Sequence, residues 1–189
     1  MGWNDAFNHF PHLETEKYVL RRLKVTDAKS LYNYFSKDAV TKYYDLEPFQ
    51  APQQAVELIE SLLFRYEAKQ QIRWGITLKN QGDIIGTCGL HAIEKEHAKA
   101  ELGYDLHPNY WGKGVMTEVI ARIVDFGFEE MKLNRIEALY NPINHASRRV
   151  LEKNGFKIEG ILRKRFHKKG EYSDAAISAI IREDKKENL

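Results

Sequence analysis

The sequence predicts a domain of the α/β class, and three observations lead to this prediction. In residues 98–106 the apolar side chains recur at every second position, as in a half-buried strand. From Met116 onward the apolar positions fall on one face of an amphipathic helix. Elsewhere, strand-like segments are paired across short glycine-containing loops, which predicts β-hairpins. The chain has 189 residues, of which 43% are hydrophobic and 30% charged, so a single domain with a full core is expected.

Residues 1–16 show no clear period and are expected to form an N-terminal arm. This arm is followed by the domain at 17–182 and then by a C-terminal tail at 183–189. Two interpretations of the arm stay open: it is laid on the domain through its apolar side chains, or it is a disordered leader. The side chains concerned are Phe7, Phe10 and Leu13.

The domain is expected to begin with a strand and two helices. Residues 18–23 alternate as a strand. The segment 26–35 opens with Thr-Asp, a typical helix start, and its apolar positions share one face. Pro52 suits the first turn of a second amphipathic helix, which ends near Lys69.

The middle of the chain predicts a hairpin followed by the long helix. Segments 72–78 and 84–90 flank a loop that contains Gly82, and the second is expected to continue toward Glu94 and pair with 98–106. After the turn at the end of that strand, the helix runs to about residue 131.

The last part of the chain predicts a strand, a short helix and a final hairpin. The strand is 135–140, and the helix at 146–151 has Gly155 as its C-cap. Segments 156–166 and 172–181 then pair around a Lys-Gly turn.

Composition excludes several classes of protein. A net charge of +2 is too small to indicate binding to nucleic acid or to a membrane surface, and no apolar run approaches the ~20 residues of a membrane span. The lone Cys88 excludes an internal disulfide and suits a cytoplasmic protein; it is expected to be a small buried hydrophobe. The seven histidines show no metal-ligand spacing, so no metal is expected.

The turn from Asn109 to Val115 is a candidate anion site. Gly112 and Gly114 precede the helix, where unpaired backbone N–H groups gather at the positive end of the helix dipole. The alternative is that these glycines serve the turn alone. A dinucleotide fingerprint would need a third glycine at Thr117, and the P-loop pattern is absent.

Four runs of residues carry a resemblance to a known family. They are Glu101-Leu-Gly-Tyr-Asp-Leu, Tyr110-Trp-Gly-Lys-Gly with Thr117-Glu118, Asn141-Pro-Ile-Asn144-His-Ala-Ser147, and Glu152-Lys-Asn-Gly155-Phe156. With them the chain resembles the GNAT superfamily of acyl-CoA N-acyltransferases. Within it the chain is most similar to the Rim-type ribosomal-protein N-terminal acetyltransferases, over about 18–181. The family pattern has Gln or Arg where this chain has Asn109, but a backbone cradle does not depend on that side chain.

The resemblance implies the GNAT fold, a mixed, mostly antiparallel sheet of about seven strands with helices on both faces. It implies acetyl-CoA as co-substrate, with its pyrophosphate on the glycine turn and its pantetheine arm in a splay between strands 98–106 and 135–140. The residues that the resemblance assigns to acetyl-CoA are Leu106, Trp111, Gly112, Lys113, Gly114, Val115, Met116, Thr117, Asn144 and Ser147.

The reaction implied is direct attack of a neutral amine on the thioester. Glu101 is the first candidate for general base, because partial burial could raise its pKa, and Asp105 on the same strand face is the fallback. The other interpretation is that Glu101 faces solvent. Ser147 is the candidate proton donor to the leaving sulfur, with Tyr140 as the runner-up; Asn144 and Ser147 also suit the cap and first turn of the short helix.

The acceptor is expected to be a primary amine, with a protein N-terminus as the first candidate. The resemblance makes Tyr43 and Tyr44 candidates for its pocket; the alternative is that they only pack in the core or on the surface. The rival acceptors are polyamines or aminoglycosides, which a cleft crowded with carboxylates, such as Asp45 and Glu47, would favour. A sensor that binds acyl-CoA without turnover is the other alternative. The basic run 163–169 is interpreted as the solvated tip of a hairpin rather than an RNA contact. No membrane partner is expected, and the protein is expected to be a monomer or homodimer.

Overall fold

In the computed structural model, which describes residues 5–44, 46–168 and 170–186, eight strands form one sheet. Their spatial order is β1-β2-β3-β4-β5-β6-β8-β7, and neighbours pair antiparallel except β5 and β6, which are parallel. The strands are β1 (Leu13–Glu14), β2 (Tyr18–Arg22), β3 (Ile72–Leu78), β4 (Gly86–Glu94), β5 (Lys99–Leu106), β6 (Arg135–Tyr140), β7 (Lys157–Lys168) and β8 (Glu171–Ile181). The mixed, mostly antiparallel sheet is therefore confirmed.

The pairing of β5 with β6 is short, and this opens the sheet at its centre. The two strands are in register only at Lys99 with Arg135, Ala100 with Ile136 and Glu101 with Glu137. Beyond Glu101, β5 continues in register with β4 alone. The carbonyl groups of Tyr104 and Leu106 accept hydrogen bonds from side chains instead. The two strands thus diverge beyond Glu101, as the resemblance implied.

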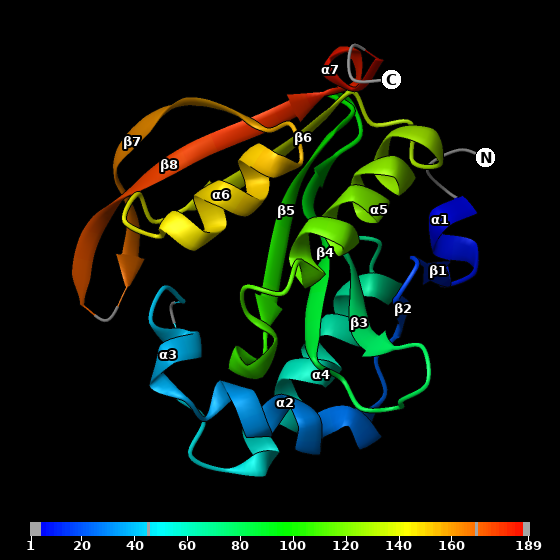
Figure 1. Cartoon of the computed structure of the whole chain (residues 1–189), viewed down its shortest axis with the longest axis vertical. Coiled ribbons are helices and arrows are strands. Elements are labelled where there is room, and N and C mark those ends of the chain that lie inside the picture. The colour runs from blue at the N-terminus through cyan, green and yellow to red at the C-terminus, as the bar shows by residue number, and fades with distance from the viewer. Residues whose placement is uncertain (1–4, 45, 169, 187–189) are drawn as a thin grey trace.

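Helices cover both faces of the sheet, as Figure 1 shows. On one face lies α5 (Val115–Glu129), whose apolar side packs on the sheet through residues such as Phe126, which contacts Trp74 edge to face. Helix α6 (His145–Lys153) lies beside it. On the other face α2 (Ala28–Phe35) packs with α4 (Pro52–Glu67) over Leu23 and Ile84. The short α3 (Asp38–Thr41) follows α2 at the mouth of the central opening.

The N-terminal segment lies against the end of the sheet. Helix α1 (Asp5–Asn8) carries Phe7, which is buried against Tyr66. The ring of Phe10 contacts Tyr66 in a tilted arrangement and Trp74 edge to face. The indole of Trp74 donates a hydrogen bond of 2.7 Å to the carbonyl of Pro11. Leu13 is buried in β1. Of the two interpretations of this segment, the described part matches an arm laid on the domain.

The described elements differ from the prediction or add to it at three places. The sheet has eight strands rather than about seven, because Leu13–Glu14 adds the two-residue β1 to its edge. The predicted tail begins instead with a helix, α7 (Arg182–Lys186), where the Asp184 carboxylate accepts a hydrogen bond from the Ile181 N–H. Helix α3 has no counterpart in the prediction, since four residues are too few for a visible period. Residues 1–4, 169 and 187–189, on which parts of the arm, turn and tail predictions fall, lie outside the described residues.

Candidate active site

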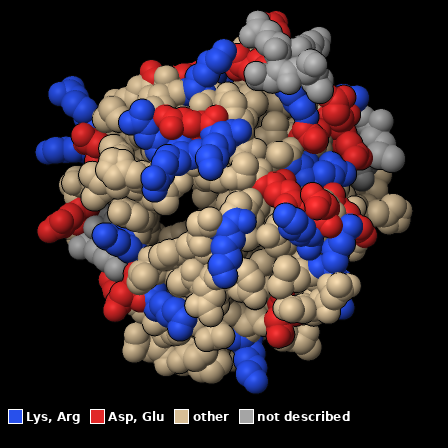
Figure 2. Space-filling model, viewed as in Figure 1, with Lys and Arg blue, Asp and Glu red and all other residues tan. Residues whose placement is uncertain are grey.

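A cavity of about 350 Å³ lies where β5 and β6 diverge. Its walls come from β3, β4, β5, β6, the segment after α3, the start of α6 and the β7–β8 hairpin. Figure 2 shows a hollow in this part of the molecule, between α6 and α3, with Lys and Arg side chains around it. The cavity thus connects the α5–α6 face of the sheet with the α2–α4 face, which allows two substrates to approach from opposite sides.

Tyr43 and Tyr44 line this cavity, as the sequence suggested. The Tyr44 hydroxyl donates a hydrogen bond of 2.6 Å to the Tyr104 carbonyl on the open edge of β5. Burial raises the pKa of Tyr44, and the nearby Asp105 carboxylate adds to the effect, so its phenol stays protonated. The phenol therefore ties the segment after α3 to the splayed strand.

Asp105, the fallback base, is the centre of a buried network. Its carboxylate accepts hydrogen bonds from the Tyr34 hydroxyl (2.6 Å), the Thr87 hydroxyl (2.6 Å) and Nη2 of Arg73 (2.6 Å). Arg73 Nε donates to the Thr87 hydroxyl as well. A carbon at the Cβ position of Gly103 would stand 2.9 Å from Arg73 Nη1, so the glycine makes room for the guanidinium to cross β5. Asp105 is only 6% exposed, and its carboxylate is engaged in this network.

Glu101 lies on the same strand face and lines the cavity. Burial raises the pKa of its carboxyl, and Glu137 beside it in the parallel register raises it further. His91 stands opposite on β4, with Nδ1 4.0 Å from the Glu101 carboxylate. Burial, helped by Arg73 and Arg65, lowers the pKa of His91 to about 4, so its imidazole is neutral at neutral pH. Glu101 is therefore a partly desolvated carboxyl group at the cavity wall.

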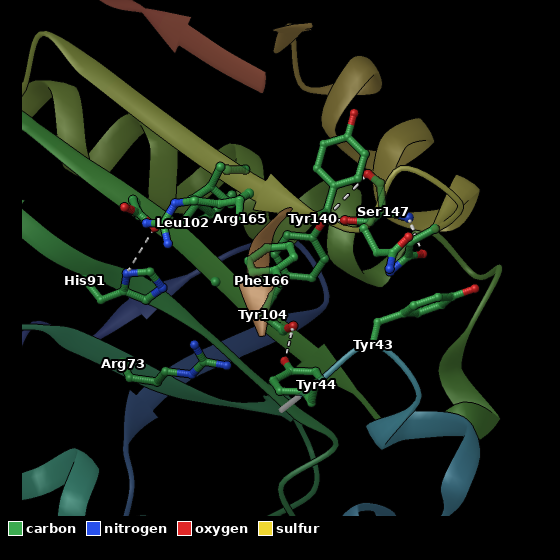
Figure 3. A pocket seen from close by; sticks show the side chains of 16 residues that line it. Tyr43, Tyr44, Arg73, His91, Leu102, Tyr104, Tyr140, Ser147, Arg165 and Phe166 are labelled. Atoms are coloured by element: carbon green, nitrogen blue, oxygen red, sulfur yellow. Dashed lines mark hydrogen bonds and ion pairs between the residues drawn. The ribbon is translucent and has the colours of Figure 1, made fainter. Parts of the chain in front are cut away.

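On the other side of the opening, Ser147 is held in place by two contacts. Its backbone N–H donates to the side-chain oxygen of Asn144 (3.1 Å), which caps α6 as predicted. Its hydroxyl shares a hydrogen bond of 2.5 Å with the Tyr104 hydroxyl. Burial raises the pKa of Tyr104, and the bond to Ser147 works against that rise. Figure 3 shows Ser147 across the cavity from His91 and Arg73.

The glycine turn has the conformation that an anion cradle needs. Gly112 and Gly114 adopt φ angles of 72° and 79°, and a Cβ at either would meet no described atom within 4 Å. Gly114 is the N-cap of α5, so the first N–H groups of the helix, from Val115 on, have no partner within the helix. The Trp111 indole donates to the Leu106 carbonyl at 2.8 Å and joins the turn to the end of β5. Val115 and Met116 are buried, which leaves only their backbone for a ligand.

The remaining candidates have other surroundings. Tyr140 lines the cavity, but its hydroxyl is 3.2 Å from the Ser178 hydroxyl and lies within hydrogen-bonding distance of it. Cys88 is fully buried, and burial raises the pKa of its thiol to about 12, which confirms the prediction of a buried hydrophobe. Glu47 does not line the cavity, and Asp45 lies outside the described residues.

Several cavity residues were not found from the sequence. Tyr104 was assigned to the apolar face of its strand, although a phenol also carries a polar tip. Arg73 and His91 lie on strands with no motif around them. Arg165 and Phe166 come from the basic run, which is indeed largely exposed in a hairpin but also reaches the cavity. No local sequence signal places these five residues at one site, because only the pairing of distant strands brings them together.

Comparison with known proteins agrees with this geometry. Residues 17–157 match the family model described as the acetyltransferase (GNAT) domain. YoaA, an uncharacterized N-acetyltransferase of Bacillus subtilis (strain 168), is 39% identical over 92% of this chain and 98% of its own. The spermidine N(1)-acetyltransferase of Escherichia coli (strain K12) is 27% identical over 82% of this chain and 81% of its own. A solved ribosomal-protein-S5-alanine acetyltransferase from Vibrio fischeri has a TM-score of 0.77 and 28% identity over 92% of this chain and 98% of its own.

A sheet that opens beside a glycine turn, in a chain with these relatives, defines an N-acetyltransferase. The chain belongs to the GNAT acetyltransferase family. None of the helices in its described parts has the length and apolar character that a membrane crossing requires.

Proposed function

We propose that this enzyme transfers the acetyl group of acetyl-CoA to the N-terminal amine of a protein, with ribosomal proteins as the first candidates. The observation that supports this most is the charge of the cavity. Glu101 is the one carboxylate among its described lining residues, whereas two arginines, Arg73 and Arg165, also line it. A single carboxylate suits one amine. The charge of Arg73 is balanced by Asp105, whereas Arg165 would repel a polycation.

The turn at 112–117 supports acetyl-CoA as the co-substrate. Its two left-handed glycines leave open space over backbone N–H groups, where a side chain would stand in the way of a pyrophosphate. In this proposal Trp111, Lys113 and Thr117 flank the pyrophosphate, and the open edge of β5 near Leu106, with Asn144, receives the pantetheine arm. Acetyl-CoA supplies the acetyl group as an activated thioester.

Glu101 is the proposed general base. It would take the proton that the amine loses as the nitrogen forms its bond to the acetyl carbon, directly or through water. Its raised pKa brings the carboxylate closer to the pKa of about 7.7 to 8.0 of an N-terminal amine, which makes the transfer easier. Much of such an amine is already neutral near pH 7.5, so a stronger base is not required.

Ser147 is the proposed proton donor to the sulfur when the carbon–sulfur bond breaks. The Tyr104 hydroxyl, in hydrogen-bond contact with it, could return a proton to Ser147. The proton that leaves the amine and the proton that the thiolate gains balance, so the products are an amide and the free thiol of CoA. Tyr140 is the alternative donor, although its hydroxyl is close to Ser178.

A polyamine or aminoglycoside is the second candidate acceptor, and the likeness to the spermidine enzyme is the observation that favours it. Tyr43 and Tyr44 would line the acceptor side in either case. A sensor without turnover is the third possibility.

The test measures CoA release by the purified protein with a thiol reagent, against N-terminal peptides of ribosomal proteins, polyamines and aminoglycosides. Thermal unfolding is followed in parallel with acetyl-CoA. At 100 times its Kd the co-substrate should stabilise the protein by about 2.7 kcal/mol. Turnover of peptides alone supports the proposal, and turnover of polyamines alone contradicts the acceptor. Stabilisation without turnover points to a sensor, and the absence of both contradicts acetyl-CoA as the co-substrate.

A further inference from the structure

The charged residues of the cavity differ in how far their charges are balanced. Arg73 is paired with Asp105 at 2.6 Å, so this buried pair presents little net charge. His91 is neutral at neutral pH because burial lowers its pKa. Two charged lining residues then remain, Glu101 and Arg165. In Figure 3 Arg165 lies on the side of the cavity away from Ser147.

Arg165 is exposed, and among the described residues no salt bridge to its guanidinium is found within 4.0 Å. It is close enough to Glu101 to lower that carboxyl's pKa, against the larger effect of burial. An arginine carries five donors in a planar fork that matches a carboxylate, and it keeps its charge at any physiological pH. Arg165 is therefore a cation at the cavity wall with its donors available.

The local backbone turns Arg165 and its neighbour into the cavity. The register of β7 with β8 shifts between Leu162 and Phe166, which marks a bulge. Within it Lys164 adopts a φ of 50°, which is uncommon for a residue with a side chain. The Lys164 N–H donates to the Asp174 carboxylate of β8 at 2.8 Å and holds this conformation. Arg165 and Phe166 both line the cavity as a result.

We propose that Arg165 is a specificity-determining residue that binds an acidic side chain within the first three residues of the acceptor peptide. This inference rests on the proposed function, since it concerns the acceptor of that reaction. The reacting amine would lie between its proposed base, Glu101, and the sulfur near Ser147, and in Figure 3 Arg165 lies on the other side of the cavity from Ser147. The carboxylate that it binds therefore belongs to a side chain further along the peptide than the amine itself. Tyr43 and Phe166 also line the cavity and supply apolar surface to its walls.

The experiment compares hexapeptides that carry Asp, Asn or Lys at position 1, 2 or 3 and are otherwise identical. The kcat/KM for the preferred Asp peptide should exceed that for its Asn counterpart by roughly fivefold at low salt. The ratio should fall toward one near 1 M salt, where the Debye length is only about 3 Å. Binding of the same peptides to the CoA complex is measured by titration calorimetry, so that recognition is read without turnover.

Four variants test the assignment to Arg165. Arg165→Gln should remove the preference for Asp, and Arg165→Glu should favour the Lys peptide instead. Arg163→Gln is the matched control, because Arg163 is exposed on the same strand and does not line the cavity. This variant should prefer the Asp peptide as strongly as the parent protein does. Asp174→Ala removes the hydrogen bond that holds the bulge but leaves Arg165 in place. This variant should show a weaker preference for the Asp peptide, with a thermal midpoint within a few degrees of the parent's.

The outcomes separate this inference from the function on which it rests. Turnover of peptides with equal kcat/KM for Asp and Asn overturns the role of Arg165 and leaves the acetyltransferase proposal standing. A second outcome is that the Asp peptide binds more tightly, that Arg165→Gln removes this difference, and that no peptide is turned over. This outcome supports recognition by Arg165 and contradicts the proposed reaction. An Asp preference that survives in Arg165→Gln overturns the inference, as does the absence of both turnover and binding for all peptides.

Discussion

The carboxyl groups of Glu101 and Asp105 lie four residues apart on one face of β5, but their surroundings differ. Asp105 accepts hydrogen bonds from Tyr34, Thr87 and Arg73, whereas Glu101 lines the cavity beside the neutral His91. Burial therefore acts on Glu101 without a compensating donor of that kind, and its pKa is raised. Partial burial and contact with the cavity are what make Glu101, rather than Asp105, the proposed base.

Replacing Glu101 by Gln is expected to lower kcat/KM by about 10²-fold, the lower range for general-base catalysis. The ratio of wild-type to variant kcat/KM should rise with pH through the Glu101 pKa and then level off, since the ionisation of the amine cancels in the ratio. That pKa should lie above the ordinary value of 4.5, because burial disfavours the carboxylate. A ratio that does not change with pH would remove Glu101 as the base.

The same pKa shift has a consequence for stability. The folded state binds the Glu101 proton more tightly than the unfolded state does, so this contribution to stability is present at low pH. It is lost as the pH rises from the unfolded pKa through the raised folded one. The Gln variant should thus be no less stable than the parent at pH 7, which serves as the folding control for the kinetic test.

Replacing Ser147 by Ala should lower kcat about tenfold or more, with the Kd for acetyl-CoA changed less than about threefold. Tyr104→Phe should lower kcat as well, since it removes the partner of the Ser147 hydroxyl. Tyr140→Phe is the control, because its hydroxyl is close to Ser178 instead. Pre-steady-state thiol release and equilibrium binding measure the two quantities. If Ser147→Ala keeps the wild-type kcat and Tyr140→Phe lowers it, Tyr140 rather than Ser147 is the proton donor.

At the scale of elements, the turn between β5 and α5 combines two requirements. Positive φ angles at Gly112 and Gly114 direct the chain from the strand into the helix, and the lack of side chains leaves the helix N-terminus open. A motif of this kind can be recognised in the sequence because both requirements select glycine at fixed positions. The adjoining splay cannot, because it arises where pairing between β5 and β6 stops.

The Gly114→Ala variant should raise the Kd for acetyl-CoA about tenfold or more, because the new methyl group occupies the space proposed for the pyrophosphate. The left-handed conformation should also cost about 1–2 kcal/mol of stability. Gly82→Ala is the matched control: a Cβ there meets no described atom within 4 Å either, and the residue lies in the β3–β4 loop. Calorimetric titration and thermal unfolding test both effects. Equal affinities in the two variants would contradict the cradle.

At the scale of the whole molecule, the N-terminal segment stabilises the sheet at a distance from the cavity. Its aromatic side chains pack on Tyr66 and Trp74, and Trp74 in turn contacts Phe126 of α5. The segment therefore completes the core on the α5 side of the sheet. Neither Phe7 nor Phe10 lines the cavity.

Truncating Phe7 to Ala should lower the free energy of unfolding by about 3 kcal/mol, since it leaves a hole beside Tyr66. The Kd for acetyl-CoA and the kcat of the folded protein should not change. Phe64→Ala is the control, because Phe64 is 72% exposed and its loss should cost less than about 0.5 kcal/mol. Denaturant unfolding gives the two free energies. Equal stability of the two variants would show that the arm does not contribute to the core.

Comparison of prediction and structure shows which elements a local sequence pattern can predict. The strand at Lys99–Leu106, the helix after Gly114 and the cap at Asn144 agree with the sequence patterns, since each depends on neighbours within a few positions. The two-residue β1 and the short α3 were missed because neither is long enough to show a period. The short α7 at the start of the tail was likewise not predicted.

By itself the sequence determined the order of the main strands and helices, the glycine turn and the capped start of α6, because these follow from local backbone geometry and side-chain periodicity. Only the tertiary structure decided which polar groups meet. Arg73 pairs with Asp105 across two strands, and Tyr104 reaches Ser147 across the opening of the sheet. A bulge in the β7–β8 hairpin places Arg165 at the cavity, although it lies some 60 positions after Glu101 in the sequence. Such contacts depend on strand register and on burial, which couple residues that are far apart in the chain.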